Sequence, residues 1–149
     1  MKKLLVACCM LFFAYNVNAQ MYGGYNLGLA FRPGMSNSPL MNLRFGYQFN
    51  EVFDPNGLIV AEYDQRSFTG GVSPFYLGGR VGYGWNTGEN TTFILSGGGY
   101  YRFLSSSEKA DGNYWIGGYG LTFLYKNLSV EVSKVEFYQA AIGCHYYFD

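Results

Sequence analysis

The sequence predicts an all-β fold, an eight-stranded antiparallel up-and-down transmembrane β-barrel, and three observations support this prediction. Large apolar residues alternate with polar or small residues along most of the chain, a period typical of strands whose two faces meet different media. Charged residues make up only 13% of the 149 residues while aromatic residues reach 20%, so the chain has few charges to cover a water-facing surface. The alternating segments are about eleven residues long, the length of a tilted strand that crosses a bilayer.

Residues 40–50 show the alternation clearly. Every second residue is large and apolar, and these residues are Met41, Leu43, Phe45, Tyr47 and Phe49. The residues between them are Asn42, Arg44, Gly46, Gln48 and Asn50. This second set holds one charge and a glycine, which is too sparse for the surface of a soluble protein but suits the crowded interior of a narrow barrel. We therefore expect the apolar set to face lipid.

Turn-forming residues separate the first four predicted strands. The first strand covers residues 22–32, and the Pro/Gly/Ser/Asn-rich residues 33–39 end it before the strand described above. A turn at 50–57, with the sequence Asp-Pro-Asn-Gly at its end, leads to the third strand at 58–66. The fourth strand, at 75–85, alternates as clearly as the second.

The next two strands are separated by the longest polar loop. The fifth strand covers residues 91–104 and the sixth covers 114–125, with a serine-rich loop at 105–113 between them. Lys126-Asn127 then makes a tight hairpin. Because loops on a rigid scaffold usually carry function, a ligand would be expected at the loops, although their composition names none.

The last two predicted strands are less regular. The seventh covers residues 128–137, but its alternation is lost near Lys134-Val135, where we expect a β-bulge. A short link near Tyr138 leads to the eighth strand at 139–148.

Because eight is an even number, a closed up-and-down barrel returns both ends of the chain to the same side. Closure is expected because an open edge in lipid would leave backbone groups unpaired, at several kcal/mol each. Glycines recur on the inward-facing set, as expected for a lumen in which small and large residues must alternate. These glycines are Gly28, Gly46, Gly78, Gly82, Gly84, Gly98, Gly118, Gly120 and Gly143. Aromatic residues near strand ends should form the girdles at the two membrane interfaces. Examples are Trp85, Trp115, Tyr125 and Phe148.

A signal peptide is predicted at residues 1–19, followed by the barrel domain at 20–149. Two lysines precede an apolar run at 4–15, and a Val-Asn-Ala sequence ends at Ala19, where we expect cleavage. A lipobox ending at Cys8 is the alternative, but it would leave too few apolar residues ahead of the cysteine. No later stretch is long and apolar enough for a transmembrane helix.

The signal peptide, the eight alternating strands and the aromatic end Tyr146-Tyr147-Phe148 resemble small outer-membrane β-barrel proteins of the OmpA/OmpX-like kind. The resemblance implies the outer membrane of a Gram-negative-type cell envelope, with outer-membrane lipid and the barrel-assembly machinery as partners. In that family a terminal Phe with apolar residues at alternate positions is the assembly signal, which implies this role for Phe148 and Tyr146. This chain differs because Asp149 follows Phe148.

Charged residues on the inward-facing set are candidate functional residues. If the N-terminus is periplasmic, Arg44, Glu62 and Arg80 lie at similar heights on neighbouring strands, and we predict an ion-pair cluster in the lumen. Its expected role is structural, because an unpaired charge in a narrow interior costs several kcal/mol. A gated ion path is the alternative, disfavoured because eight strands leave little open lumen.

A second lumen pair is predicted between Glu131 and His145, which should both lie near the periplasmic end. A His–carboxylate pair could belong to a hydrolase, and lipid A deacylases and palmitoyltransferases resemble this chain in size. Those families place His and Ser toward the outer rim or the lipid face, and no H-x-S motif follows His145. We therefore expect no enzyme activity.

Other signals are weak. The glycine run at 97–99 lacks the Lys-Ser/Thr of a phosphate-binding loop, so no nucleotide site is predicted. Cleavage would leave Cys144 as the one thiol, and without a Cys/His cluster neither a metal nor another cofactor is expected. A formal net charge of zero gives no reason to expect nucleic acid as a partner.

The predicted function is that of a small outer-membrane barrel with a structural or surface-interaction role. A narrow porin-like channel or transport component is the second interpretation, and a lipid-modifying enzyme is the third. A secreted soluble barrel would require the apolar set to point inward.

Overall fold

The computed structural model describes residues 19–31, 33–34, 36–68, 75–103 and 114–148. The predicted signal peptide, except Ala19, and the serine-rich loop lie outside the described residues. Within the described residues no helix is long and apolar enough to cross a membrane.

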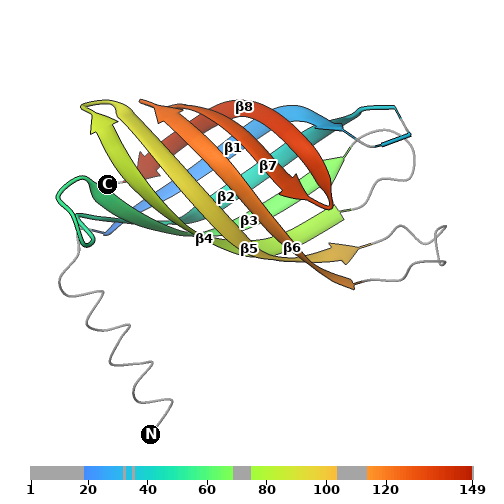
Figure 1. Cartoon of the computed structure of the whole chain (residues 1–149), viewed down its shortest axis with the longest axis horizontal. Coiled ribbons are helices and arrows are strands. Elements are labelled where there is room, and N and C mark those ends of the chain that lie inside the picture. Colours follow the sequence, from blue (N-terminus) through green and yellow to red (C-terminus); the bar gives the residue numbers. More distant parts are fainter. Residues whose placement is uncertain (1–18, 32, 35, 69–74, 104–113, 149) are drawn as a thin grey trace, which may run out of the picture.

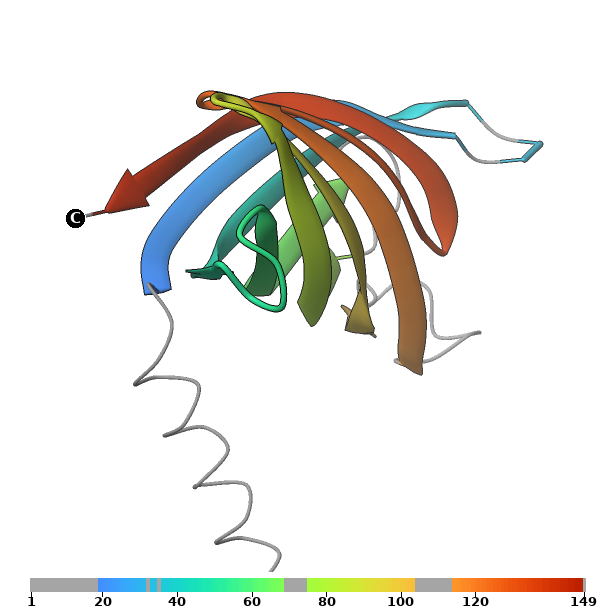
Figure 2. The ribbon, with the colours of Figure 1, turned by 60° about the vertical axis from the view of Figure 1, so that its left-hand side comes forward.

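Eight antiparallel strands form one closed barrel in which each strand pairs with its neighbours in sequence and β8 pairs with β1 (Figures 1 and 2). The strands are β1 (Ala19–Phe31), β2 (Ser38–Asn50), β3 (Gly57–Phe68), β4 (Phe75–Gly88), β5 (Thr91–Phe103), β6 (Tyr114–Tyr125), β7 (Leu128–Val135) and β8 (Phe137–Phe148). The predicted fold class is confirmed. The closing pair is continuous from Met21 opposite Phe148 to Phe31 opposite Tyr138.

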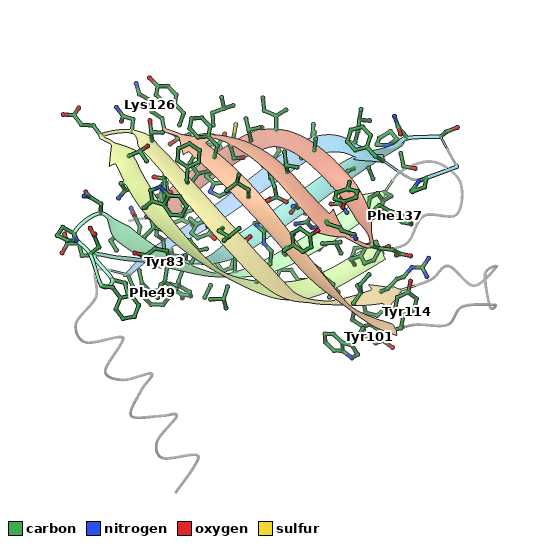
Figure 3. All side chains as sticks on the ribbon, in the orientation of Figure 1. Phe49, Tyr83, Tyr101, Tyr114, Lys126 and Phe137 are labelled. Atoms are coloured by element: carbon green, nitrogen blue, oxygen red, sulfur yellow. The ribbon has the colours of Figure 1, made fainter. Side chains whose placement is uncertain are left out.

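The barrel has two distinct ends. The first residues of β1 and the last residues of β8 lie at one end, on the left of Figure 1, which we call the termini end. At the opposite end, which we call the loop end, β1, β3, β5 and β7 end and β2, β4, β6 and β8 begin. Phe49 and Tyr83 lie toward the termini end, and Tyr101 and Tyr114 lie toward the loop end (Figure 3).

The two faces of the wall follow the predicted alternation. The exposed set on β2 includes Phe45, 49% exposed, whereas the preceding Arg44 is only 4% exposed because it points into the lumen. The expected girdle residues also point outward, Trp115 near the loop end and Trp85, Tyr125 and Phe148 near the termini end. Most of the large apolar side chains on the strands are thus outside the barrel, the reverse of a soluble fold.

The prediction of a bulge near Lys134-Val135 was wrong. β7 keeps a regular register to Val135, which pairs with Phe137 across a one-residue turn. Glu136 makes this turn with a φ of 62°, in the left-handed region. The loss of alternation marks the end of the strand, and Tyr138 belongs to β8 rather than to a link. The register shift in this barrel lies instead between Asn86 and Gly88, in the β4–β5 pair.

The lumen is filled in three layers. An apolar cluster occupies the termini end and consists of Tyr22, Leu58, Val60, Ile94 and Leu124, with Tyr147 packed against it. A second apolar cluster occupies the loop end and consists of Ala30, Leu40, Phe68, Tyr76, Tyr100, Val135 and Ala141, with Ile116 packed against it. Charged side chains lie between the two: on β3, the inward residues run from Leu58 and Val60 through Glu62, Asp64 and Arg66 to Phe68.

Candidate functional site

Six buried charged side chains meet in the middle layer, and we call them the ionic cluster. Its members are Arg44, Arg66, Arg80, Glu62, Asp64 and Glu131. They come from β2, β3, β4 and β7. Three guanidinium groups meet three carboxylates, so the cluster carries no formal net charge. This balance matters because a buried charge without a partner costs several kcal/mol.

The structure brings Glu62 and Arg80 together directly. The two residues are cross-strand partners in the β3–β4 pair, and the Nε of Arg80 donates a hydrogen bond of 2.5 Å to Oε1 of Glu62. Arg44, the third member of the predicted cluster, forms its ion pair with Glu131 on β7 rather than with Glu62. Arg44 and Arg80 both contact Oε2 of Glu131, so this carboxylate links them.

Glu131 is the centre of the cluster. Its Oε1 accepts from Nη2 of Arg66 at 2.9 Å, its Oε2 accepts from Nη1 of Arg80 at 3.0 Å, and the Thr122 hydroxyl donates to Oε2 at 3.2 Å. With the contact from Arg44, one carboxylate touches all three arginines. A carboxylate offers about four lone-pair sites, and three of these four donors converge on Oε2.

Sequence reasoning did not assign Asp64 and Arg66 to the cluster. Oδ2 of Asp64 accepts from Nη2 of Arg66 at 2.8 Å and from the Tyr100 hydroxyl at 2.7 Å. Arg66 also donates to Ser133 at 2.7 Å and to Gln139 at 2.5 Å on the far strands. Their alternation with outward residues indicated that both point into the lumen, as Glu62 does. Which residues they contact across the lumen depends on the curvature of the barrel.

The predicted Glu131–His145 pair is not formed. Glu131 is opposite Ala141 on β8, four residues from His145, and its carboxylate is held by the arginines. His145 instead stacks on Tyr22, with ring centroids 5.2 Å apart, and its Nε2 has no hydrogen-bond partner among the described residues. Gly24 is the cross-strand partner of His145, and a Cβ at Gly24 would lie 2.7 Å from the imidazole Cδ2. The histidine therefore fills space left by a glycine.

Tyr22 connects the apolar layer at the termini end to the ionic cluster. Its hydroxyl donates a hydrogen bond of 2.5 Å to Oε2 of Glu62, while its ring packs among apolar side chains. Tyr100 does the same from the loop end through Asp64. Each tyrosine gives an apolar body to one layer and a polar tip to the next.

A smaller polar group, the rim cluster, lies at the loop end and consists of Tyr76, Arg102, Tyr114 and Glu136. Oε2 of Glu136 lies 3.3 Å from Nε of Arg102, and its Oε1 accepts from the Tyr114 hydroxyl at 2.9 Å. Tyr76 donates to the same carboxylate. The one-residue turn between β7 and β8 is thereby tied to β4, β5 and β6 across the mouth of the barrel.

The two residues of the implied assembly signal lie at the end of the closing strand. Tyr146 and Phe148 point outward on β8, opposite Gly23 and Met21 of β1. Asp149 lies outside the described residues. Within the described residues, no group of three or more His, Cys, Asp or Glu side chains could hold a metal ion.

A closed barrel with an apolar exterior and a packed ionic interior defines a class, that of transmembrane β-barrels. Among solved structures, a de novo designed transmembrane β-barrel is similar to this chain, with a TM-score of 0.50 and 14% identity over 87% of this chain and 95% of the designed one. At this level of identity the likeness shows the fold alone, and the chain has the fold of a transmembrane β-barrel.

One natural protein among the similar structures is Ail, the attachment invasion locus protein of Yersinia pestis. Its backbone structure in a phospholipid nanodisc has a TM-score of 0.49 and 16% identity, covering 85% of this chain and 99% of Ail. Its crystal structure has a TM-score of 0.47 and 17% identity, covering 87% and 97%. No family model matches the sequence, and no curated protein matches it.

Proposed function

We propose that this chain is a small integral outer-membrane β-barrel with a structural or surface-interaction role and no catalytic activity. The observation that supports this proposal is the inversion of the wall, with large apolar side chains outside and a neutral ionic cluster inside. Such an exterior is stable in hydrocarbon and would aggregate in water. In this proposal the termini end faces the periplasm and the loops face outward.

The three-layered lumen supports a closed scaffold rather than a channel. A solute would have to displace both apolar clusters and break the ion pairs between them. Each broken buried pair costs several kcal/mol, because it leaves a desolvated charge. The narrow channel therefore remains the less favoured function.

The surroundings of His145 support a non-catalytic role. The imidazole is buried in the lumen against the Tyr22 ring, away from the lipid face where a lipid-modifying enzyme meets its substrate. A hydrolase would need a nucleophile and an orienting carboxylate within hydrogen-bond distance of the imidazole. Glu131, the candidate carboxylate, is engaged by three arginines instead.

Assembly by the barrel-assembly machinery would use the outward residues at the end of β8. Both Phe148 and Tyr146 are large, apolar and exposed beside β1. We expect Phe148→Ala to lower the amount of folded protein in the outer membrane, with Leu95→Ala, on the outward face of β5, as the control. Equal yields of the two variants would remove the assembly role of Phe148.

Two measurements test the main proposal. Folded protein should be recovered in the outer-membrane fraction and should migrate differently on an SDS gel before and after boiling. Recovery in the soluble periplasmic fraction without detergent would overturn it. Reconstituted protein should show no discrete single-channel current, and steady conductance steps would favour the channel instead.

A further inference from the structure

Among the described residues, the outward-facing surface of the strands carries one charge. Arg44, Glu62, Arg80 and the other charged strand residues point into the lumen, whereas Lys134, near the loop end of β7, points outward. Its Nζ lies 5.1 Å from the centre of the Tyr138 ring on β8. Among the described strand residues it is the exception to an otherwise uncharged lipid face. A cation facing lipid is costly unless it meets an anion at the membrane interface.

Immediately below this lysine the wall is hollowed. An apolar groove of about 340 Å³ opens on the outer surface of β1, β8 and β7. Its floor is Ala140, the smallest outward side chain in a region of large ones, and its sides include Leu27, Leu29, Val130, Val132 and Ile142.

The strand register aligns the groove with the lysine. Ala140 is opposite Leu29 on β1 and Val132 on β7. Two residues toward the loop end, Tyr138 is opposite Phe31 on β1 and Lys134 on β7. Aromatic side chains and a lysine thus lie at the loop-end edge of the groove, and these residue types are the ones that anchor at a membrane interface.

We propose that this groove binds one acyl chain of a lipid whose anionic phosphate headgroup pairs with Lys134. The proposal rests on the proposed membrane-spanning function, because the groove opens onto the surface that would face hydrocarbon. The apolar hollow fits a hydrocarbon chain, and the ammonium group complements the phosphate at its end. One site would thus bind both the acyl chain and the phosphate headgroup of the lipid.

A second copy of the chain fits this surface less well. A two-fold interface centred on the groove would bring the Lys134 residues of both copies toward each other in a low-dielectric setting. Free phosphate would gain only the single lysine and none of the apolar contacts. A lipid with an anionic headgroup would contact both the apolar groove and Lys134.

Competition between two lipids with identical chains tests the proposal. The detergent-purified wild type is incubated with equal amounts of dioleoylphosphatidylglycerol and dioleoylphosphatidylcholine, and retained lipid is counted by native mass spectrometry. We expect one phosphatidylglycerol to be retained at least fivefold over phosphatidylcholine, and 10 mM inorganic phosphate should not displace it. Lys134→Gln should abolish the preference while leaving retention of phosphatidylcholine unchanged.

Variants of the groove separate shape from charge. Ala140→Leu should reduce retention of both lipids at least fivefold, and Ala140→Val should reduce it less. Ala61→Leu fills the equivalent outward position of β3 and should change nothing. The double variant Lys134→Gln/Gln65→Lys keeps the net charge of the protein but moves the lysine to the outward face of β3. It should not restore the preference for phosphatidylglycerol.

Four results would overturn the proposal: equal retention of the two lipids by the wild type, full retention by Ala140→Leu, displacement by phosphate, or a protein dimer in place of the lipid complex. Each variant is first checked for heat-modifiable migration. Loss of that property in the wild type would contradict the proposed function itself, whereas unselective retention by a heat-modifiable barrel contradicts this inference alone.

Discussion

The inner and outer faces of the barrel wall differ sharply, and the consecutive residues Gly97, Gly98 and Gly99 on β5 show how. A Cβ at the inward Gly98 would collide with the carbonyl oxygen of Gly79 and lie 2.9 Å from the Cα of Arg80. A Cβ at the outward Gly99 would have a Trp115 atom as its nearest neighbour, at 4.0 Å. At this strand the lumen therefore has no space for an added methyl group, whereas the outer face does. The same residue type is a steric necessity on one side and a free choice on the other.

Removing the central carboxylate should be the most damaging change to the inner face. Glu131→Gln leaves three arginines facing two carboxylates, so we expect a loss of about 3–5 kcal/mol of unfolding free energy. Urea unfolding of the protein folded in lipid vesicles, followed by tryptophan fluorescence, measures it. A free energy of unfolding equal to that of the wild type would show that the ion pairs do not stabilise the lumen.

Glu62→Gln should have a smaller effect. Glu62 pairs with one arginine, whereas Glu131 pairs with all three. The amide oxygen of the Glu62→Gln variant can also still accept from Tyr22 or Arg80, so the expected loss is about 1–3 kcal/mol. A double-mutant cycle with Arg80→Met isolates the pair, and we expect a coupling free energy of the same sign and order. If thermal stability does not fall in Glu62→Gln, the predicted structural role of this cluster is wrong.

The glycine run tests the comparison within one strand. Gly98→Ala should cost about 1–3 kcal/mol through overpacking, whereas Gly99→Ala should stay within about 0.5 kcal/mol of the wild type. The midpoint of heat-modifiable gel migration ranks the two variants under identical conditions. Similar midpoints would mean that the two faces do not differ in packing.

Of the two polar clusters, the rim cluster should respond less. In Glu136→Gln, an ion pair with Arg102 at the more open loop end is lost, and such pairs contribute about 1 kcal/mol or less. Urea unfolding should therefore show a shift well below that of Glu131→Gln, and added salt should reduce it further. A shift as large as that of Glu131→Gln would place the main electrostatic support at the mouth of the barrel.

The alternation of side chains predicted the wall of the barrel well. Strand β6 has the predicted bounds, and every predicted outward residue of β2 is exposed or partly exposed. The Glu62–Arg80 pair follows from hairpin geometry, since adjacent strands of similar length place these residues opposite each other. Local periodicity and turn chemistry were sufficient for these features.

Contacts across the lumen were not predictable in the same way. Arg44 reaches Glu131 from β2 to β7, and that distance depends on the tilt and stagger of all the intervening strands. The pairing of Glu131 with His145 was expected because both were placed near the same end of neighbouring strands. The carboxylate is instead paired with arginine side chains that extend across the lumen. The one-residue turn at Glu136 also gave no sequence signal, because it lacks the usual glycine or asparagine.

The charges of the ionic cluster are divided unequally between the two halves of the chain. Strands β2 to β4 supply the three arginines but only two of the three carboxylates, which is an excess of one positive charge. The missing anion, Glu131, is delivered by the hairpin that seals the cylinder against β1. Charge neutrality of the ionic cluster and closure of the barrel therefore depend on the same hairpin.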